Sequence, residues 1–173
     1  VVKGAKVKIL DDNGKEVPQG EVGRIFVGNT FPFEGYTGGG GKQIIDGLLS
    51  SGDVGYFDEH GLLYVSGRDD EMIVCGGENV FPREVEEFLY TVPGISDVQV
   101  IGVPDAKYGE ELMAWVKLRP GVSLTGDEIR AYCKGKIATY KIPRYYKFVD
   151  GYPMTVSGKV QKYKMREQSI HEL

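Results

Sequence analysis

Two different patterns of apolar and polar positions follow one another along the chain. Up to about residue 66 the chain has the pattern of strands: Lys6–Leu10 alternates polar and apolar residues, and further short strands are predicted over residues 24–27, 54–57 and 62–65. Turn residues separate these runs, and Asn13-Gly14 is typical of a tight hairpin turn. This part of the sequence therefore predicts a small antiparallel sheet or a piece of a barrel.

From about residue 67 the pattern becomes a mixture of helical and strand periods. Pro82 suits the first turn of a helix, and Val85, Phe88, Leu89 and Val92 follow it at helical spacing. Two apolar runs come next and predict adjacent strands. The first contains Val98, Val100 and Val103, and the second spans residues 112–118.

A second helix and a last strand complete this part of the chain. Residues 125–128 read Thr-Gly-Asp-Glu, which is the form of a capping box at a helix start. The inner face of that helix is predicted to be Ile129, Cys133 and Ile137, so Cys133 is expected to be a packed core thiol. A last strand is expected over residues 145–149.

The change of pattern between residues 67 and 70 predicts a domain boundary. The predicted fold class is α+β, with a small antiparallel β subdomain joined by a hinge to a compact α+β C-terminal domain. We assign residues 1–68 to the first and 69–173 to the second. Because the chain begins with Val1 inside a strand pattern, we expect it to be part of a longer protein.

Composition and charge narrow the classes of function. The net charge of −4 argues against a nucleic-acid partner. Between residues 134 and 166, however, nine basic residues face one acidic residue, which indicates either a solvated face or a surface for a small polyanion. The two cysteines and two histidines have no metal-ligand spacing, so no metal site is predicted. No apolar run is long enough for a membrane span, and we expect a cytoplasmic protein.

A series of short motifs carries the functional prediction. Neither a Walker loop nor a Gly-x-Gly-x-x-Gly register occurs. The motifs, in chain order, are Gly20-Glu21-Val22-Gly23, Gly35-Tyr36, Asp46-Gly47, Ser51-Gly52-Asp53, Gly67-Arg68-Asp69-Asp70, Gly76-Gly77-Glu78-Asn79, residues 82–86 and Pro153-Met154-Thr155-Val156-Ser157-Gly158-Lys159. In this order and spacing, residues 4–166 resemble the adenylate-forming (AMP-binding) enzymes, and among them the C-terminal portion of the acyl-CoA synthetases.

The resemblance implies a two-step ligation. ATP and a carboxylate would give an acyl-adenylate and pyrophosphate, and the thiol of CoA would then displace AMP. Mg²⁺ is expected with ATP, held through the nucleotide phosphates because the chain shows no ligand cluster. The implied partners are a small carboxylic acid, ATP, CoA and the family's N-terminal domain. The phosphate loop and acyl pocket of that domain do not occur in this sequence, so the isolated chain is expected to be inactive.

The resemblance also assigns roles to residues near the predicted boundary and the C-terminus. Asp53 matches the position that binds both ribose hydroxyls, for which a carboxylate is suited. Arg68 matches an arginine near the ribose and phosphate, although spacing alone equally favours an ion pair with Asp69 or Asp70. Asp70 matches the hinge of domain rotation. Lys159 matches the lysine that reaches the substrate carboxylate and the α-phosphate.

CoA contacts are assigned in the same way. Gly76, Gly77 and Asn79 match the segment that lines the pantetheine channel, where glycine allows a narrow thiol arm to pass close to backbone. The alternative for these residues is a turn leading into the helix at residue 82. Lys141 and the neighbouring Arg144 are candidate contacts for CoA phosphates.

Three hypotheses therefore stand after the sequence is read. The first is an ATP-dependent acyl-CoA synthetase acting on a short- to medium-chain or branched fatty acid, with aryl acids as the rival substrates. The second is a peptide-synthetase adenylation unit, for which the 14 residues after Lys159 are too few to form a carrier domain, leaving a carrier that acts in trans. The third is that the fragment alone is a non-catalytic binding or structural module.

Overall fold

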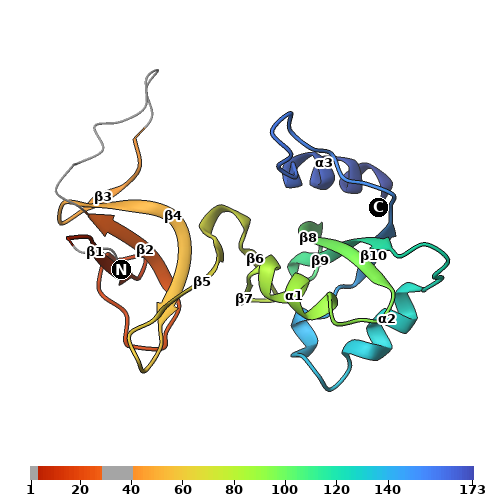
Figure 1. Cartoon of the computed structure of the whole chain (residues 1–173), viewed down its shortest axis with the longest axis horizontal. Helices are drawn as coiled ribbons and strands as arrows, with labels where there is room; N and C mark the ends of the chain where they lie inside the picture. The colour runs from red at the N-terminus through yellow and green to blue at the C-terminus, as the bar shows by residue number, and fades with distance from the viewer. Residues whose placement is uncertain (1–3, 29–40) are drawn as a thin grey trace. The chain divides into compact units, whose positions relative to one another are not determined.

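A computed structural model of the chain describes residues 4–28 and 41–173. The chain divides into two compact units, Val1–Asp70 and Glu71–Leu173, and we describe each by itself (Figure 1). This division falls two residues after the boundary that the sequence pattern suggested. The Gly35-Tyr36 motif lies outside the described residues.

The first unit is an antiparallel sheet, as the alternating pattern predicted. Its strand order is β1-β2-β4-β3, and β5 pairs with β4. Its strands are β1 (Lys6–Leu10), β2 (Gly23–Gly28), β3 (Ile44–Ile45), β4 (Leu48–Phe57) and β5 (Leu63–Arg68). A small core of Leu10, Phe26 and Leu48 lies under it. The short β3 was not predicted, because two residues are too few to show a period.

The second unit combines a five-stranded sheet with three α-helices. Its strand order is β10-β9-β6-β7, with β8 also paired to β9; β10 runs parallel to β9 and the other pairs are antiparallel. The 3-10 helix η1 (Asp69–Glu71) includes the last two residues of the first unit and the first residue of the second. The elements that follow it are β6 (Ile73–Cys75), β7 (Glu78–Val80), α1 (Pro82–Leu89), β8 (Ile95–Asp105), β9 (Gly109–Leu118), α2 (Gly126–Cys133), η2 (Thr139–Lys141), β10 (Tyr145–Phe148) and α3 (Lys162–Glu172).

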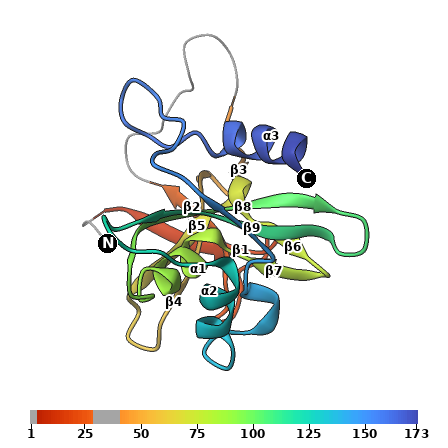
Figure 2. The same ribbon diagram turned by 90° about the vertical axis from the view of Figure 1, so that its right-hand side faces the viewer.

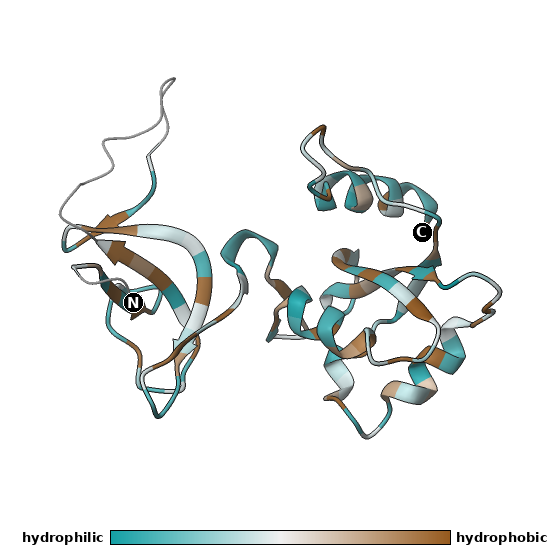
Figure 3. Cartoon of the chain, viewed as in Figure 1, coloured by the Kyte–Doolittle hydropathy of each residue, from teal (hydrophilic) through white to brown (hydrophobic). Residues whose placement is uncertain are grey.

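The β8–β9 hairpin is buried on both faces. Both views place α1 and α2 on one side of it and α3 on the other (Figures 1 and 2). Alternate residues of β9 pack into two different cores. Leu112, Ala114 and Val116 face the core under α1 and α2. Met113 and Trp115 pack with Met165 of α3 on the other face. Apolar residues accordingly concentrate in the strands (Figure 3). This two-sided burial explains why β8 and β9 read as nearly continuous apolar runs.

Two helices end earlier than the spacing of apolar residues suggested. α2 ends at Cys133, because Lys134 leaves the helical conformation and Gly135 has a φ of +73°. Ile137 is therefore not on the helix, and the prediction of a continuous inner face was wrong there, although Ile137 still packs against the same core. α1 likewise ends at Leu89, and Val92 is buried just beyond it.

Gly76 and Gly77 form a hairpin turn between β6 and β7, rather than a turn leading directly into α1. Their φ angles are +60° and +91°, as the central residues of a tight two-residue hairpin turn require. The helix begins six residues after Gly76, with Pro82 in its first turn. The prediction that these glycines form the turn leading into the helix at residue 82 was therefore wrong, because β7 lies between them and α1.

The start of α2 is held by the predicted capping box. The hydroxyl of Thr125 accepts a hydrogen bond from the backbone N–H of Glu128, and the Glu128 carboxylate accepts one from the backbone N–H of Thr125. Two backbone donors that the helix cannot satisfy internally are thus paired. Behind this cap, Ile129 and Cys133 are buried, and burial raises the pKa of the Cys133 thiol.

We expect Thr125→Ala to reduce the free energy of unfolding by about 1 kcal/mol, because the hydroxyl no longer accepts from the Glu128 N–H or donates to the Glu128 carboxylate. Denaturant unfolding of the variant measures this change. Ser123→Ala, an exposed position just before the cap, is the matched control and should be close to neutral. Equal stability of the two variants would show that the capping box contributes nothing.

Candidate functional site

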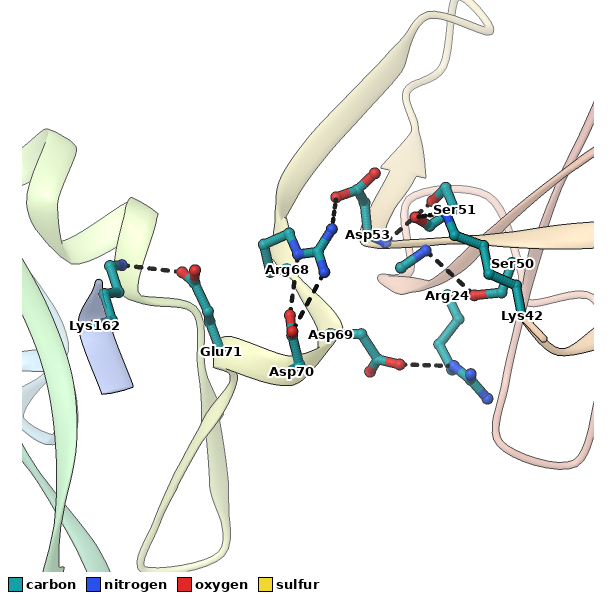
Figure 4. A network of polar contacts seen from close by, with 11 residues as sticks. Arg24, Lys42, Ser50, Ser51, Asp53, Arg68, Asp69, Asp70, Glu71 and Lys162 are labelled. Carbon is teal, nitrogen blue, oxygen red and sulfur yellow. Dashed lines mark hydrogen bonds and ion pairs between the residues drawn. The ribbon is translucent and has the colours of Figure 1, made fainter. Parts of the chain in front are cut away.

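The register of β4 and β5 brings three of the predicted residues together. Asp53 lies directly opposite Arg68 in the strand pair, and Arg68 Nη1 is 3.8 Å from Asp53 Oδ1. The same guanidinium donates to both carboxylate oxygens of Asp70, with distances of 3.0 and 3.3 Å (Figure 4). Gly52 lies beside this guanidinium, and a Cβ there would be 3.4 Å from Arg68 Nη1, an ordinary van der Waals contact. Two carboxylates therefore flank one permanent cation.

The backbone that carries Asp53 is held by its own serine side chains. Ser51 Oγ accepts from the backbone N–H of Asp53 at 3.0 Å, and Ser50 Oγ accepts from that of Gly52 at 3.3 Å. Lys42 donates to the carbonyl oxygen of Ser51 at 2.8 Å (Figure 4). Gly52 has a φ of +85°, which a residue with a side chain rarely adopts. The Ser-Gly-Asp motif is thus a shaped segment that presents a partly exposed carboxylate.

The two aspartates that follow Arg68 have different partners. Asp69 accepts a hydrogen bond from Arg24 of β2 at 2.9 Å, whereas Asp70 pairs with Arg68. The Arg68 guanidinium, through its hydrogen bonds to the carboxylate, lowers the pKa of Asp70 below its ordinary value. The ion pair that spacing suggested for Arg68 is thus present, and it coexists with the approach to Asp53.

The Gly76–Gly77 turn lies beside a cavity of about 940 Å³ in the second unit. The N–H of Gly76 donates to the carbonyl oxygen of Tyr108 at 3.0 Å, and a Cβ on Gly76 would come 3.2 Å from the Tyr108 ring. Gly76, Tyr108 and Tyr140 all line the cavity. Two aromatic rings and a glycine turn therefore form part of its wall, a surface suited to a flat ring or a narrow chain.

Both positively and negatively charged side chains line the same cavity. Arg130, Lys134 and Arg144 contribute cations, and Glu78 and Glu111 contribute carboxylates. Arg144 Nη1 is 3.4 Å from Glu111 Oε1. Arg130 is in turn paired with Asp127 at 2.6 Å, so two of the three cations already have a carboxylate partner.

Lys141 and Asn79 do not line this cavity. Lys141 Nζ is 2.5 Å from Glu84 Oε1 of α1, so it ties η2 to that helix. Asn79 is exposed in β7, opposite Val74 in the hairpin register. The roles assigned to these two residues in CoA binding stay predictions.

Lys159 lies at the end of a tight turn in the segment before α3. The Thr155 N–H donates to the Lys159 carbonyl oxygen at 2.8 Å, and the Lys159 N–H donates to Thr155 Oγ1 at 3.0 Å. Gly158 takes a φ of +80° within this turn. The Lys159 side chain is exposed, and within residues 4–28 and 41–173 its ammonium has no hydrogen bond or ion pair. A hydrogen-bonded turn thus presents an exposed ammonium.

The sequence pointed to Asp53, Arg68 and Asp70 one by one, and the structure brings them together, but most of the cavity wall was missed. Three segments supply the missed residues: the β8–β9 turn gives Tyr108, α2 and the residue after it give Arg130 and Lys134, and η2 gives Tyr140. Among the described residues, no group of three or more His, Cys, Asp or Glu side chains could hold a metal ion. No helix in the described part of the chain is long and apolar enough to cross a membrane.

The comparisons with known proteins agree on one family. Residues 84–159 match the AMP-binding enzyme C-terminal domain. The Bacillus subtilis protein YngI, named as an acyl-CoA synthetase, is 59% identical over 125 residues, which are 72% of this chain and 23% of that protein. The mitochondrial medium-chain acyl-CoA ligase ACSF2 of Bos taurus is 51% identical over 128 residues, or 74% of this chain and 21% of that protein.

A solved structure shows the same fold. ATP-bound MatB from Rhodopseudomonas palustris matches with a TM-score of 0.89 and 33% identity, over 96% of this chain and 34% of that one. The chain thus spans between about a fifth and a third of the length of these relatives.

We expect Arg68→Met to raise the pKa of Asp70 toward its ordinary value, because the donating guanidinium is lost. A carboxyl with a lowered folded-state pKa stabilises the fold above its unfolded-state pKa, and this contribution disappears as the pH falls through the folded-state value. The variant should therefore lose stability at neutral pH but not in strong acid. The loss should be small, because the Asp70 side chain is 69% exposed.

NMR titration of the side-chain carboxyl carbons measures the shift. Asp105 provides the control, since the N–H groups of Tyr108 and Lys107 lower its pKa and the substitution leaves them in place. An Asp70 titration that is unchanged in the variant would contradict the assigned cause.

Proposed function

Because this chain belongs to the adenylate-forming enzymes and carries their C-terminal domain, we propose that it is the C-terminal part of an ATP-dependent acyl-CoA synthetase. The whole enzyme would join a carboxylic acid to CoA through an acyl-adenylate. The observation that carries the proposal is Lys159, an exposed ammonium on a hydrogen-bonded turn that has no partner within the described residues. Such a cation is available to an anionic ligand.

In the first half-reaction, Lys159 would contact the substrate carboxylate and the α-phosphate of ATP. Both reactants are anions, and a cation between them offsets their repulsion and helps to place the attacking carboxylate oxygen. The charge that develops on the α-phosphate oxygens in the transition state would be stabilised by the same ammonium. This role requires that the turn hold Lys159 at a defined position.

Asp53 and Arg68 would bind the nucleotide ribose and its phosphate. The Asp53 carboxylate is a pure acceptor and can accept from both ribose hydroxyls, while Arg68 supplies donors beside it. The serine hydrogen bonds that shape the Asp53 segment support this role, because they hold the backbone from which the carboxylate extends.

Asp70 would serve as the hinge between the two half-reactions. It is the last residue of the first unit, and few backbone angles at such a boundary need to change to reorient a domain. Its ion pair with Arg68 is exposed, so it adds little resistance to rotation.

In the second half-reaction, the Gly76–Gly77 turn would lie along the pantetheine arm of CoA, with Asn79 beside it. The neighbouring cavity offers Lys134 and Arg144 to the CoA phosphates and two tyrosine rings to its base. Lys141 would contribute only by exchanging Glu84 for a phosphate, and this makes it an additional contact rather than the main one.

Mg²⁺ would be held by the nucleotide phosphates. The described part of the chain contains no cluster of metal-binding side chains, so these residues do not form a site for the ion, and we assign no step to it. As substrate we propose a medium-chain fatty acid, in line with the name of the bovine relative.

The test of this function is acid-dependent exchange of pyrophosphate into ATP by the full-length enzyme, followed by AMP release on addition of CoA. A panel of short, medium, long and aromatic acids would identify the substrate class. We expect the 173-residue chain alone to show no exchange. Exchange by that chain, or an enzyme that forms adenylate but releases no AMP with CoA, would contradict the proposal.

We expect Lys159→Ala in the full-length enzyme to slow acyl-adenylate formation by about a hundredfold or more, because a positioned charge at the reacting phosphate is lost. Thioester formation from supplied acyl-adenylate should be largely retained, since that step begins after the carboxylate has reacted. Lys164→Ala, at another exposed lysine nearby, is the control. A parallel fall of both half-reactions would rule out the role assigned to Lys159.

A further inference from the structure

Lys162 makes the most enclosed ion pairs of the C-terminal segment. Its ammonium is 3.0 Å from Glu71 Oε2 and 2.9 Å from Glu86 Oε1, and the side chain is only 19% exposed (Figure 4 shows the contact with Glu71). Glu86 is also anchored to the sheet, because its Oε1 accepts from the backbone N–H of Val100 at 2.8 Å. One lysine thus joins α3 to α1 and to the residue that follows Asp70.

The start of α3 depends on this lysine for its placement. Gln161, the residue before the helix, makes no side-chain capping hydrogen bond, and the first turn contains no acidic residue. Lys162 instead puts a cation where the helix dipole favours an anion. Glu71 and Glu86 supply the missing negative charge from elsewhere in the unit, so local helix preference does not account for a lysine at this position.

The turn that carries Lys159 is attached directly to this anchor. Met154 and Val160 form a bridge across the turn, and the N–H of Gln161 donates to the carbonyl oxygen of Pro153 at 2.8 Å. Lys162 follows Lys159 by three residues. The position of Lys159 therefore depends on where the N-terminus of α3 is held.

Glu71, at the other end of the ion pair, directly follows the proposed hinge residue Asp70. Its orientation depends on the same backbone angles that a hinge rotation changes. The Glu71–Lys162 pair therefore connects the hinge to the catalytic turn through one salt bridge, although the two residues are 91 positions apart in sequence.

We propose that Lys162 and Glu71 are positioning residues that fix the Lys159 turn relative to the hinge, so that Lys159 arrives correctly placed for adenylation. This inference rests on the proposed function, because it assigns to the pair a role that acts through Lys159. Supporting groups of this kind typically act by holding a reacting group within a fraction of an ångström of its productive position.

Glu71→Gln in the full-length enzyme is the most direct test. It removes the charge from the contact with the hinge segment and leaves the Lys162–Glu86 pair in place, so the domain should stay folded. We expect pyrophosphate exchange to fall about ten- to a hundredfold, while thioester formation from supplied acyl-adenylate stays near that of the unaltered enzyme. Glu167→Gln, at an exposed position on the same helix, should change neither rate.

Two further variants separate positioning from a loss of stability. Lys162→Arg retains a cation that can reach both carboxylates and should keep most of the exchange activity, whereas Lys162→Met should lower it as Glu71→Gln does. In a Lys159→Ala background, Glu71→Gln should cause no further loss, because the pair acts through Lys159. The thermal midpoint of each variant reports stability independently.

Exchange in Glu71→Gln equal to that in Glu167→Gln would overturn the proposal. So would an equal loss in both half-reactions, or a loss that multiplies with that of Lys159→Ala. If the unaltered enzyme shows no acid-dependent exchange at all, the proposed function itself fails, and this inference fails with it.

Discussion

The burial of β9 on both faces is the constraint on which the second unit depends. One set of its alternating side chains packs under α1 and α2, and the other packs under α3. A strand covered on both sides cannot shift by one residue without exchanging its two faces, so its register is strongly determined. The hairpin with β8 and the parallel pairing with β10 then follow from a single fixed strand.

The candidate functional groups lie in the connections around this fixed sheet. The Gly76–Gly77 turn adjoins the Gly109 end of β9, and the Lys159 turn leads into the helix that covers the opposite face. α3 has a small buried surface, limited to Met165 and Ser169, and Ser169 accepts a hydrogen bond from the Trp115 indole. Polar contacts must therefore hold much of this helix in place. The ion pairs of Lys162 and Arg166 should thus contribute more to its packing than surface ion pairs usually do.

The basic stretch between residues 134 and 166 has a clearer meaning in the folded chain. Five of its nine cations are paired with carboxylates from within the same unit: Lys141, Arg144, Lys147, Lys162 and Arg166. The stretch is thus neither a wholly solvated face nor a continuous surface for a polyanion. The other four, Lys134, Lys136, Lys159 and Lys164, form no ion pair with a carboxylate within the described residues, and of these Lys159 lies on the hydrogen-bonded turn before α3.

The sequence by itself determined the α+β class, the antiparallel sheet of the first unit, the capping box at Thr125 and the family motifs. These features are local, since each depends on residues within a few positions of one another or on a repeating period. The cluster of Asp53, Arg68 and Asp70 was also predictable, because two adjacent strands and one short turn carry it. The end of α2 was not, because Gly135 stopped the helix before its apolar period ended.

Only the tertiary structure decided which charges far apart in the sequence are paired and which surfaces form the cavity. Glu71 and Lys162 lie 91 residues apart, and the tyrosines of the cavity wall come from separate loops. Such contacts depend on how β8 and β9 are covered, and the sequence around either partner carries no sign of the other. The physical reason is that an ion pair or a cavity requires closeness in space, which local periodicity does not encode.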